Sequence, residues 1–330
     1  MTTRRARPHR RSRPLLALVC ALPVALSGCG LAADVAGVHD APTEQGRGGA
    51  VTREAAQEIA ARVLGEARTA RGDGATAEDR RSVLMGPALR EADAAARARS
   101  TASPSEAVQP QVLAVSEGTG WPRTIVATTR TDEEQRLYVL VSTSAEGAYR
   151  LFADVQMASG AAVPGLADPA QGSPVRINGT PGDAVETAVT GWSEAVAYPA
   201  PSTRPSGVSV ADEFSTALRT NAEQQAEELD GLAEYTQEQQ RQEATMVSIG
   251  LADGGRLAFV PMTRTDTLTA GEELQELTLE DAATRRLADT ESISQELTVE
   301  HAETLAVHVP SEGAARVVGA SEQIESAEGS

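Results

Sequence analysis

The sequence predicts an α+β fold in which two similar halves each place helices before an antiparallel sheet. In each half, residues with a helical period precede shorter runs with the alternation of strands. Three-residue, turn-like separators divide the first strands, and connections this short favour antiparallel pairing. The segment VATTRTD at residues 126–132 also matches VPMTRTD at 260–266, an offset of 134 residues. The same offset carries the helical segment 76–99 onto 210–233, which favours a tandem duplication.

The first half begins with two predicted helices. Thr52 precedes the first, whose apolar face recurs every four residues at Val51, Ala55, Ile59, Val63 and Ala67. Thr76 caps the second, with Asp79 three residues later. The Gly86-Pro87 pair predicts a kink or break within this second helix.

Strands are predicted after residue 104, where the period changes. The strand-like runs of the first half are residues 112–116, 124–130, 137–143 and 149–157. Residues 159–207 have the dispersed Gly, Pro and Ser of a loop, and a helical run follows over 210–241. The strand-like runs of the second half are residues 257–264, 274–279, 297–300, 304–309 and 316–320.

The first 28 residues have the pattern of a secretory signal peptide. Six Arg residues precede an apolar stretch over 15–26, and the 28 residues contain no acidic side chain. The apolar stretch is too short to be an ordinary transmembrane anchor. The stretch ends in Leu26-Ser27-Gly28-Cys29, which resembles the lipobox of bacterial lipoproteins. The resemblance implies that the Cys29 thiol is acylated and that Cys29 becomes the mature N-terminus. The Arg10-Arg11 pair leaves both the twin-arginine and the general secretory route open.

Composition limits the chemistry of the mature chain. Removing the leader leaves 23 Arg against 47 acidic residues, so the net charge falls from −18 to −24 and a nucleic-acid partner is not expected. All 29 basic residues are Arg, so no lysine is available for Schiff-base chemistry or for a Walker-type phosphate site. Cys20 leaves with the leader and Cys29 is acylated, so we expect no disulfide.

Motifs for catalysis and for metal or cofactor binding are weak. His39 lies in the expected tether, and His301 and His308 are seven residues apart on strand-like sequence, so their side chains should face opposite sides of the sheet. The chain contains no H-E-x-x-H, G-x-S-x-G or D-x-D-x-D-G segment. We therefore expect no catalytic residue, no metal and no cofactor, although spacing alone leaves a Ser-His-Asp triad possible.

Two kinds of side chain have alternative interpretations. The acidic runs could be paired catalytic carboxylates or calcium ligands, but solvated turns are their commoner role; they are residues 132–134, 272–273 and 280–281. Trp121 and Trp192 could stack on a sugar ring or an apolar ligand, or they could fill the core.

The order of elements in each half resembles the cystatin-like roll shared with nuclear-transport-factor-type domains, in which helices pack on a curved antiparallel sheet. The whole chain resembles lipoproteins of high-GC Gram-positive bacteria that carry two such rolls in tandem, a group without an established activity. The segments that carry this resemblance are the lipobox, Met85-Gly-Pro-Ala-Leu89, Trp121-Pro-Arg123, Leu305-Ala-Val-His-Val-Pro310 and Val317-Val-Gly-Ala320. The expected organisation is a signal peptide (1–28), a flexible tether (29–48), a first roll (49–170), a linker (171–207) and a second roll (208–330).

We therefore expect a non-catalytic lipoprotein on the extracytoplasmic face of the cell membrane, anchored through a lipid on Cys29. Its partner is expected to be a protein or another envelope component. One alternative is a carrier that holds an apolar small molecule in a roll cavity, and a less favoured alternative is a hydrolase. A large apolar cavity would favour the carrier, a wet cavity with a buried Asp-His pair would favour the enzyme, and filled rolls with an exposed apolar patch would favour the binding module.

Overall fold

The computed structural model covers most of the chain beyond the expected tether. It describes residues 48–100, 109–131, 134–162, 165–179, 182–229 and 231–330. Cys29 and His39, with the predictions made for them, lie outside these residues. Residues 46–330 belong to one compact unit. Within the described part of the chain, none of the helices combines the length and the apolar character needed to cross a membrane.

The fold is α+β, as the sequence predicts, and its main sheet has eleven strands and does not close. The central path runs β1-β2-β3-β4-β13-β12-β9-β8-β5, with β7 added on β9 and a parallel β6 on β13. A separate two-stranded sheet consists of β10 (Leu277–Thr278) and β11 (Ser292–Ile293). The strands of the main sheet are β1 (Gln111–Val115), β2 (Arg123–Arg130), β3 (Gln135–Ser142), β4 (Arg150–Met157), β5 (Val175–Asn178), β6 (Val208–Ser209), β7 (Ala233–Arg241), β8 (Met246–Gly250), β9 (Arg256–Ala270), β12 (Glu296–Val309) and β13 (Ala315–Gly329).

Two antiparallel meanders account for most of this sheet. The first is β1 to β4; in the second, β7 and β8 pair with different parts of β9, and β12 and β13 follow. The meanders meet where Met157 and Gln156 of β4 pair with Gly319 and Ala320 of β13, so the sheet is continuous across both halves. The repeated segment begins on β2 in the first half and lies on β9 in the second half, at the same place in each meander.

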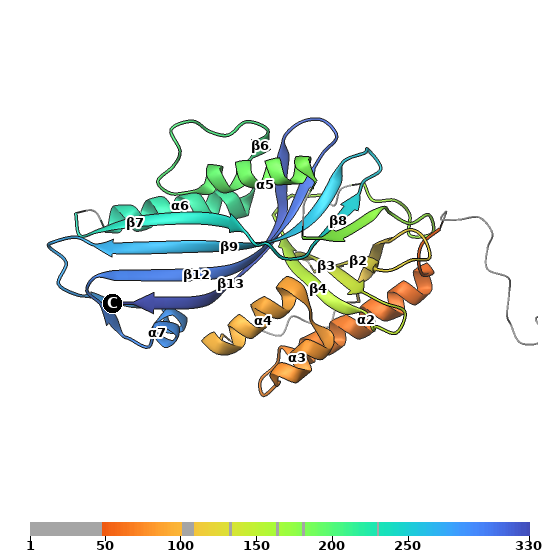
Figure 1. Ribbon diagram of the computed structural model, residues 1–330, viewed down its shortest axis with the longest axis horizontal. Coiled ribbons are helices and arrows are strands. Elements are labelled where there is room, and N and C mark those ends of the chain that lie inside the picture. Colours follow the sequence, from red (N-terminus) through yellow and green to blue (C-terminus); the bar gives the residue numbers. More distant parts are fainter. Residues whose placement is uncertain (1–47, 101–108, 132–133, 163–164, 180–181, 230) are drawn as a thin grey trace, which may run out of the picture. The chain divides into compact units, whose positions relative to one another are not determined.

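The helices lie on the faces of the sheet (Figure 1). They are α2 (Arg53–Ala70), α3 (Ala77–Val83), α4 (Gly86–Ala98), α5 (Asp183–Val196), α6 (Glu213–Glu228) and α7 (Ala282–Ala288). The Thr52 hydroxyl caps α2, and Thr76 and Asp79 form a reciprocal capping box at α3, as predicted. The predicted break is also confirmed, because α3 ends at Val83 and α4 begins at Gly86.

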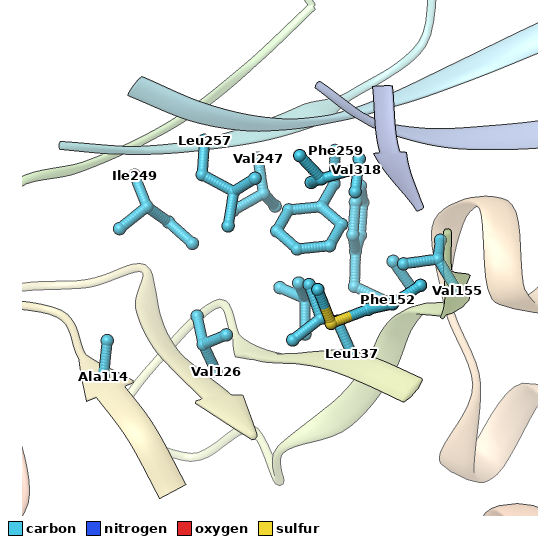
Figure 2. Packing of buried hydrophobic residues seen from close by; sticks show 14 of the residues in the cluster. Ala114, Val126, Leu137, Phe152, Val155, Val247, Ile249, Leu257, Phe259 and Val318 are labelled. Carbon is cyan, nitrogen blue, oxygen red and sulfur yellow. The ribbon is translucent and has the colours of Figure 1, made fainter. Parts of the chain in front are cut away.

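The two halves share a hydrophobic core in addition to the cores under their own helices. Phe152 and Leu137 of the first half pack with Phe259 and Leu257 of the second half, and all four side chains are fully buried (Figure 2). Separate clusters lie under α2 and α4 and under α5 and α6. Burial of this shared surface stabilises the two halves as one unit.

Gly86 is held at a position where an L side chain does not fit. Its φ is +54°, and a Cβ there would lie 2.6 Å from the buried ring of Phe152. We expect Gly86→Ala to lower the free energy of unfolding by about 2–4 kcal/mol, because left-handed strain and overpacking add. Denaturant unfolding checks this against Gly65→Ala in α2, where no atom lies within 4 Å of the new Cβ and a gain of about 0.5–1 kcal/mol is expected. Equal effects of the two variants would contradict the packing of Phe152 on Gly86.

Two predictions about the middle of the chain are wrong. The segment 171–207 was expected to be a linker, but it contains β5 and α5, and Trp192 of α5 is 2% exposed. The helix expected over 210–241 ends at Glu228, and Gly231, with φ of +75°, reverses the chain into β7. The Glu- and Gln-rich segment β7 forms a strand because every residue of β7 is paired with β9. This pairing buries Tyr235 and Gln237 on one face of β7.

The strands of the second half are longer than predicted. The two runs expected at 297–300 and 304–309 form the single strand β12, and β13 extends to Gly329. The run expected at 274–279 contains only the short β10, and α7 follows it. These long strands bring charged residues of β9, β12 and β13 together beside α6.

Candidate functional site

A pocket of about 690 Å³ lies between α6 and the long strands of the second half. We call it the α6 pocket. Side chains of α6, β7, β9, β12 and β13 line it, and residues 277–281 and Thr284 close one side. Its size is within the range of small-molecule sites in proteins.

Strand alternation places a group of charged side chains at the floor of the α6 pocket. Arg264 and Asp266 follow Met262 on one face of β9, and His301 is paired directly with Arg264 across the β9–β12 ladder. Glu303 lies on the same face of β12 as His301. These residues, together with Glu322 of β13, form the cluster that we call the Arg264 cluster.

Arg264 is the centre of this cluster and is surrounded by carboxyl groups. Its Nε lies 3.2 Å from Asp266 Oδ2, and its Nη1 lies 3.1 Å from Glu303 Oε1 and 2.9 Å from Glu322 Oε2. The Glu303 side chain is fully buried, and the Glu322 side chain is 46% exposed. Arg264 therefore offsets the buried charge of Asp266 and the charge that Glu303 carries when it ionises.

His301 lies against both members of the Arg264–Asp266 pair. Its Nε2 is 3.1 Å from Asp266 Oδ2, while Arg264 Nη2 is 2.9 Å from Nδ1 and 3.1 Å from Nε2. An atom this close to both ring nitrogens lies over the face of the imidazole, because it cannot follow both in-plane lone pairs. The imidazole is therefore fixed between a carboxylate at its edge and a guanidinium over its face.

Burial and neighbouring charges set the protonation of the cluster. Burial raises the pKa of Glu303 to about 8, although Arg264 acts in the opposite direction. Burial acts to raise the pKa of Asp266 as well, but the hydrogen bond from His301 and the charge of Arg264 outweigh it and lower that pKa. Burial and the charge of Asp266 raise the pKa of Tyr235. At neutral pH, Asp266 is therefore ionised, whereas Glu303 is largely protonated.

A second pocket of about 490 Å³, the α4 pocket, lies between α2, α4 and the strands β3, β4 and β13. Asp154 accepts hydrogen bonds from Arg71 and from Arg136, the latter at 2.8 Å, and these charges lower its pKa against the effect of burial. Glu91 accepts hydrogen bonds from Thr304 and Ser321, yet burial raises its pKa to about 7. The apolar lining of this pocket consists of alanine side chains, which offer a ligand little surface.

The structure places the two histidines and the two tryptophans in different environments. His301 reaches the α6 pocket, whereas His308 lies seven positions further along β12 on the opposite face, where burial and Arg316 lower its pKa. Trp192 is a core residue that donates a hydrogen bond to Ser215 Oγ at 2.8 Å. Trp121 is 41% exposed and lies against the Arg123 guanidinium, 3.9 Å from the ring centre.

The match to a known family covers both pockets. A family model described as "Domain of unknown function (DUF8094)" matches residues 47–329. The chain belongs to the DUF8094 family. No curated protein and no solved structure matches the chain.

The Arg264 cluster of this DUF8094 protein is the functional arrangement that sequence reasoning missed. The sequence contains a signal for this cluster. Arg264 and Asp266 alternate with β-branched residues, and they continue the strand face that begins with the apolar residues Val260 and Met262. Charged residues that continue the apolar face of a strand point to a buried ionic site.

Metal binding has no geometric support in the part of the DUF8094 chain that the structure describes. There, no group of three or more His, Cys, Asp or Glu side chains is arranged to hold a metal ion. The Asp266–His301 pair is accompanied by Arg264, whose positive charge opposes a cation at the same atoms.

Proposed function

We propose that this protein is a membrane-anchored lipoprotein of the cell envelope that binds a small molecule or a small group of an envelope component in the α6 pocket. The anchor is a lipid on Cys29, and the compact unit lies on the extracytoplasmic face of the membrane. The role is non-catalytic: the protein holds or presents its ligand. Of the binding functions considered from the sequence, the carrier is favoured because a pocket is present, although its lining is mixed and not the apolar surface expected for a carrier.

The α6 pocket is the observation that carries this proposal. Its walls combine apolar and polar side chains in similar proportion, and the Arg264 cluster contributes charged groups to them. Sites for small molecules combine apolar surface for affinity with a few polar groups for orientation. Both features are present here in one cavity.

We also propose that the two halves are tandem copies of one cystatin-like roll. The support is the order of elements, because each half has helices before a meander and the repeated segment occupies β2 in one half and β9 in the other. The pairing of β4 with β13, which joins both halves in one sheet, counts against two separate rolls. The polar pockets, one beside α4 and one beside α6, agree with this proposal.

A hydrolase is the second candidate, and the Asp266–His301 pair favours it, because a carboxylate that orients an imidazole is the arrangement of a general base. Two observations place it behind the binding function. Arg264 covers the face of the imidazole, and none of the Ser side chains in the described residues hydrogen-bonds to His301. Without a nucleophile beside the base, the pair orients groups in the pocket.

Mass spectrometry of the protein purified from its own membranes tests the binding function. We expect a small molecule to be released from the wild-type protein on denaturation, and Ala217→Trp to lower its occupancy by about tenfold, because the new indole enters the pocket opening. Gln224→Trp is the matched control, since this exposed residue of α6 does not line the pocket. No released molecule from wild type, or equal amounts from the two variants, would count against the proposal.

A further inference from the structure

We propose that the α6 pocket selects a molecule with an apolar body and one protonated amine, and that the amine is directed towards Asp266. This inference rests on the proposed binding function and specifies the class of ligand. It follows from the chemistry of the walls, the balance of charge around the pocket and the engagement of Arg264.

The walls of the α6 pocket match an apolar body. Phe214 and Leu218 of α6 and Leu268 of β9 are among the residues that line the pocket. The remaining apolar side chains are Ala217, Leu229, Leu277, Leu279, Leu297, Val299 and Ile324. Covering this surface with an apolar group releases its hydration water and supplies most of the binding free energy.

The charge around the pocket favours a cation. Five carboxyl groups line it, against the single guanidinium of Arg264; they belong to Glu228, Asp266, Glu280, Asp281 and Glu322. The lowered pKa of Asp266 keeps this carboxylate ionised at neutral and moderately acidic pH. A carboxylate walled by low-dielectric side chains attracts an ammonium group more strongly than it would in bulk water.

Arg264 is not available to an anionic ligand. Its Nε and Nη1 atoms are directed to Asp266, Glu303 and Glu322, and its Nη2 lies over His301. A ligand carboxylate would have to displace one of these groups and would then face the others. The cluster therefore disfavours fatty acids and similar anions.

Asp266 retains an acceptor for a ligand donor. Its Oδ2 is shared by Arg264 and His301, whereas Oδ1 is buried from solvent and has no hydrogen-bond partner among the described residues, so a ligand N–H reaches it only when a neighbouring side chain moves. The Tyr235 hydroxyl lies beside the same carboxylate, and the charge and hydrogen bonding between the two groups help to raise the pKa of Tyr235 and to lower that of Asp266. An N–H group beside Asp266 would satisfy a buried acceptor that otherwise destabilises the folded state.

Titration calorimetry with three probes of equal length tests the inference. The full-length lipoprotein is placed in lipid nanodiscs, with empty nanodiscs as the blank, and is titrated with hexylamine, hexan-1-ol and hexanoate. We expect hexylamine to bind about tenfold more tightly than hexan-1-ol, and hexanoate to bind most weakly, because one favourable charge contact in a partly buried site has this effect.

Two variants locate the selectivity. Asp266→Asn should reduce the preference for hexylamine over hexan-1-ol to about twofold or less, with little change in the affinity for the alcohol. Glu322→Gln, at a more exposed position, should lower hexylamine affinity about two- to threefold and leave the circular dichroism spectrum unchanged, so it serves if Asp266→Asn does not fold. Asp168→Asn, an exposed carboxyl whose partner is Arg53, should have no effect.

The outcomes separate this inference from the proposed function. Hexanoate binding as tightly as hexylamine, or an amine preference unchanged in Asp266→Asn and Glu322→Gln, overturns the amine site. Release of a bound molecule without an amine from the wild-type protein also overturns it, while the binding function stands. If no molecule is released and no probe binds, both proposals fail.

Discussion

Cys29→Ala should release the protein from the membrane. We expect nearly all of the wild-type chain in the membrane fraction and most of the variant in the soluble fraction or with an uncleaved leader. A single acyl chain gives only marginal binding to a bilayer, and two or more chains are needed for a stable anchor. The diacylglyceryl group implied by the lipobox resemblance supplies two chains at one residue, so the loss of its thiol removes the whole anchor.

Cys20→Ala is the matched control for this experiment. It removes the other thiol of the chain from the apolar stretch of the leader and leaves Leu26-Ser27-Gly28-Cys29 intact. Fractionation in low salt and high salt separates a lipid anchor from ionic attachment, because salt weakens contacts between exposed charges. A Cys29→Ala chain that is cleaved at the same site and stays as firmly in the membrane as wild type would rule out the anchor.

Local signals in the sequence predicted local structure well. The caps at Thr52 and Thr76 depend on side chains within three residues, and the break at Gly86-Pro87 depends on the missing N–H of proline. By contrast, α5 was missed because Pro181-Gly182 and Gly191 give its segment the composition of a loop. Gly191 is explained only by tertiary structure, since a Cβ there would lie 3.3 Å from Val208.

The candidate site was hidden for a different reason. Arg264 and His301 are 37 residues apart and become neighbours through the register of β9 with β12. Because side chains alternate along a strand, the spacing of seven residues correctly placed His301 and His308 on opposite faces. The alternation does not identify the strand that pairs with β12. The sequence therefore indicated that His301 lies on a strand, while its pairing with Asp266 required the sheet order.

Arg264→Leu should be strongly destabilising at pH 8. It leaves Asp266 and Glu303 without their shared cation, and breaking a buried ion pair on one side lowers the free energy of unfolding by about 3–5 kcal/mol. Arg62→Leu removes one partner of the exposed Arg62–Glu66 pair in α2 and should change it by less than about 1 kcal/mol. Urea unfolding of both variants measures the contrast.

The pH dependence identifies which carboxyl group is responsible. The folded-state pKa of Glu303, about 8, lies above its unfolded value, so its contribution to stability is fully present below about pH 4.5. That contribution is lost as pH rises towards 8, by at most about 1.4 kcal/mol per pH unit. Removing Arg264 raises the pKa of Glu303 further and extends this loss to higher pH. Asp266 has the opposite pH dependence, because its pKa is lower in the folded state than in the unfolded state. Its ionised form stabilises the fold at neutral pH, and this stabilisation is lost as the pH falls through the folded-state pKa of Asp266.

Glu303→Gln separates these two contributions, because the amide keeps the shape of the side chain and cannot ionise. Alone, it should flatten the fall in stability between about pH 4.5 and 8; combined with Arg264→Leu, it should restore part of the lost stability at pH 8 and little at pH 5. The part that is not restored belongs to Asp266, the carboxylate proposed to meet the ligand. If Glu303→Gln leaves the pH profile unchanged, Glu303 is already ionised in the folded protein, and the Arg264 cluster carries one more negative charge than the structure indicates.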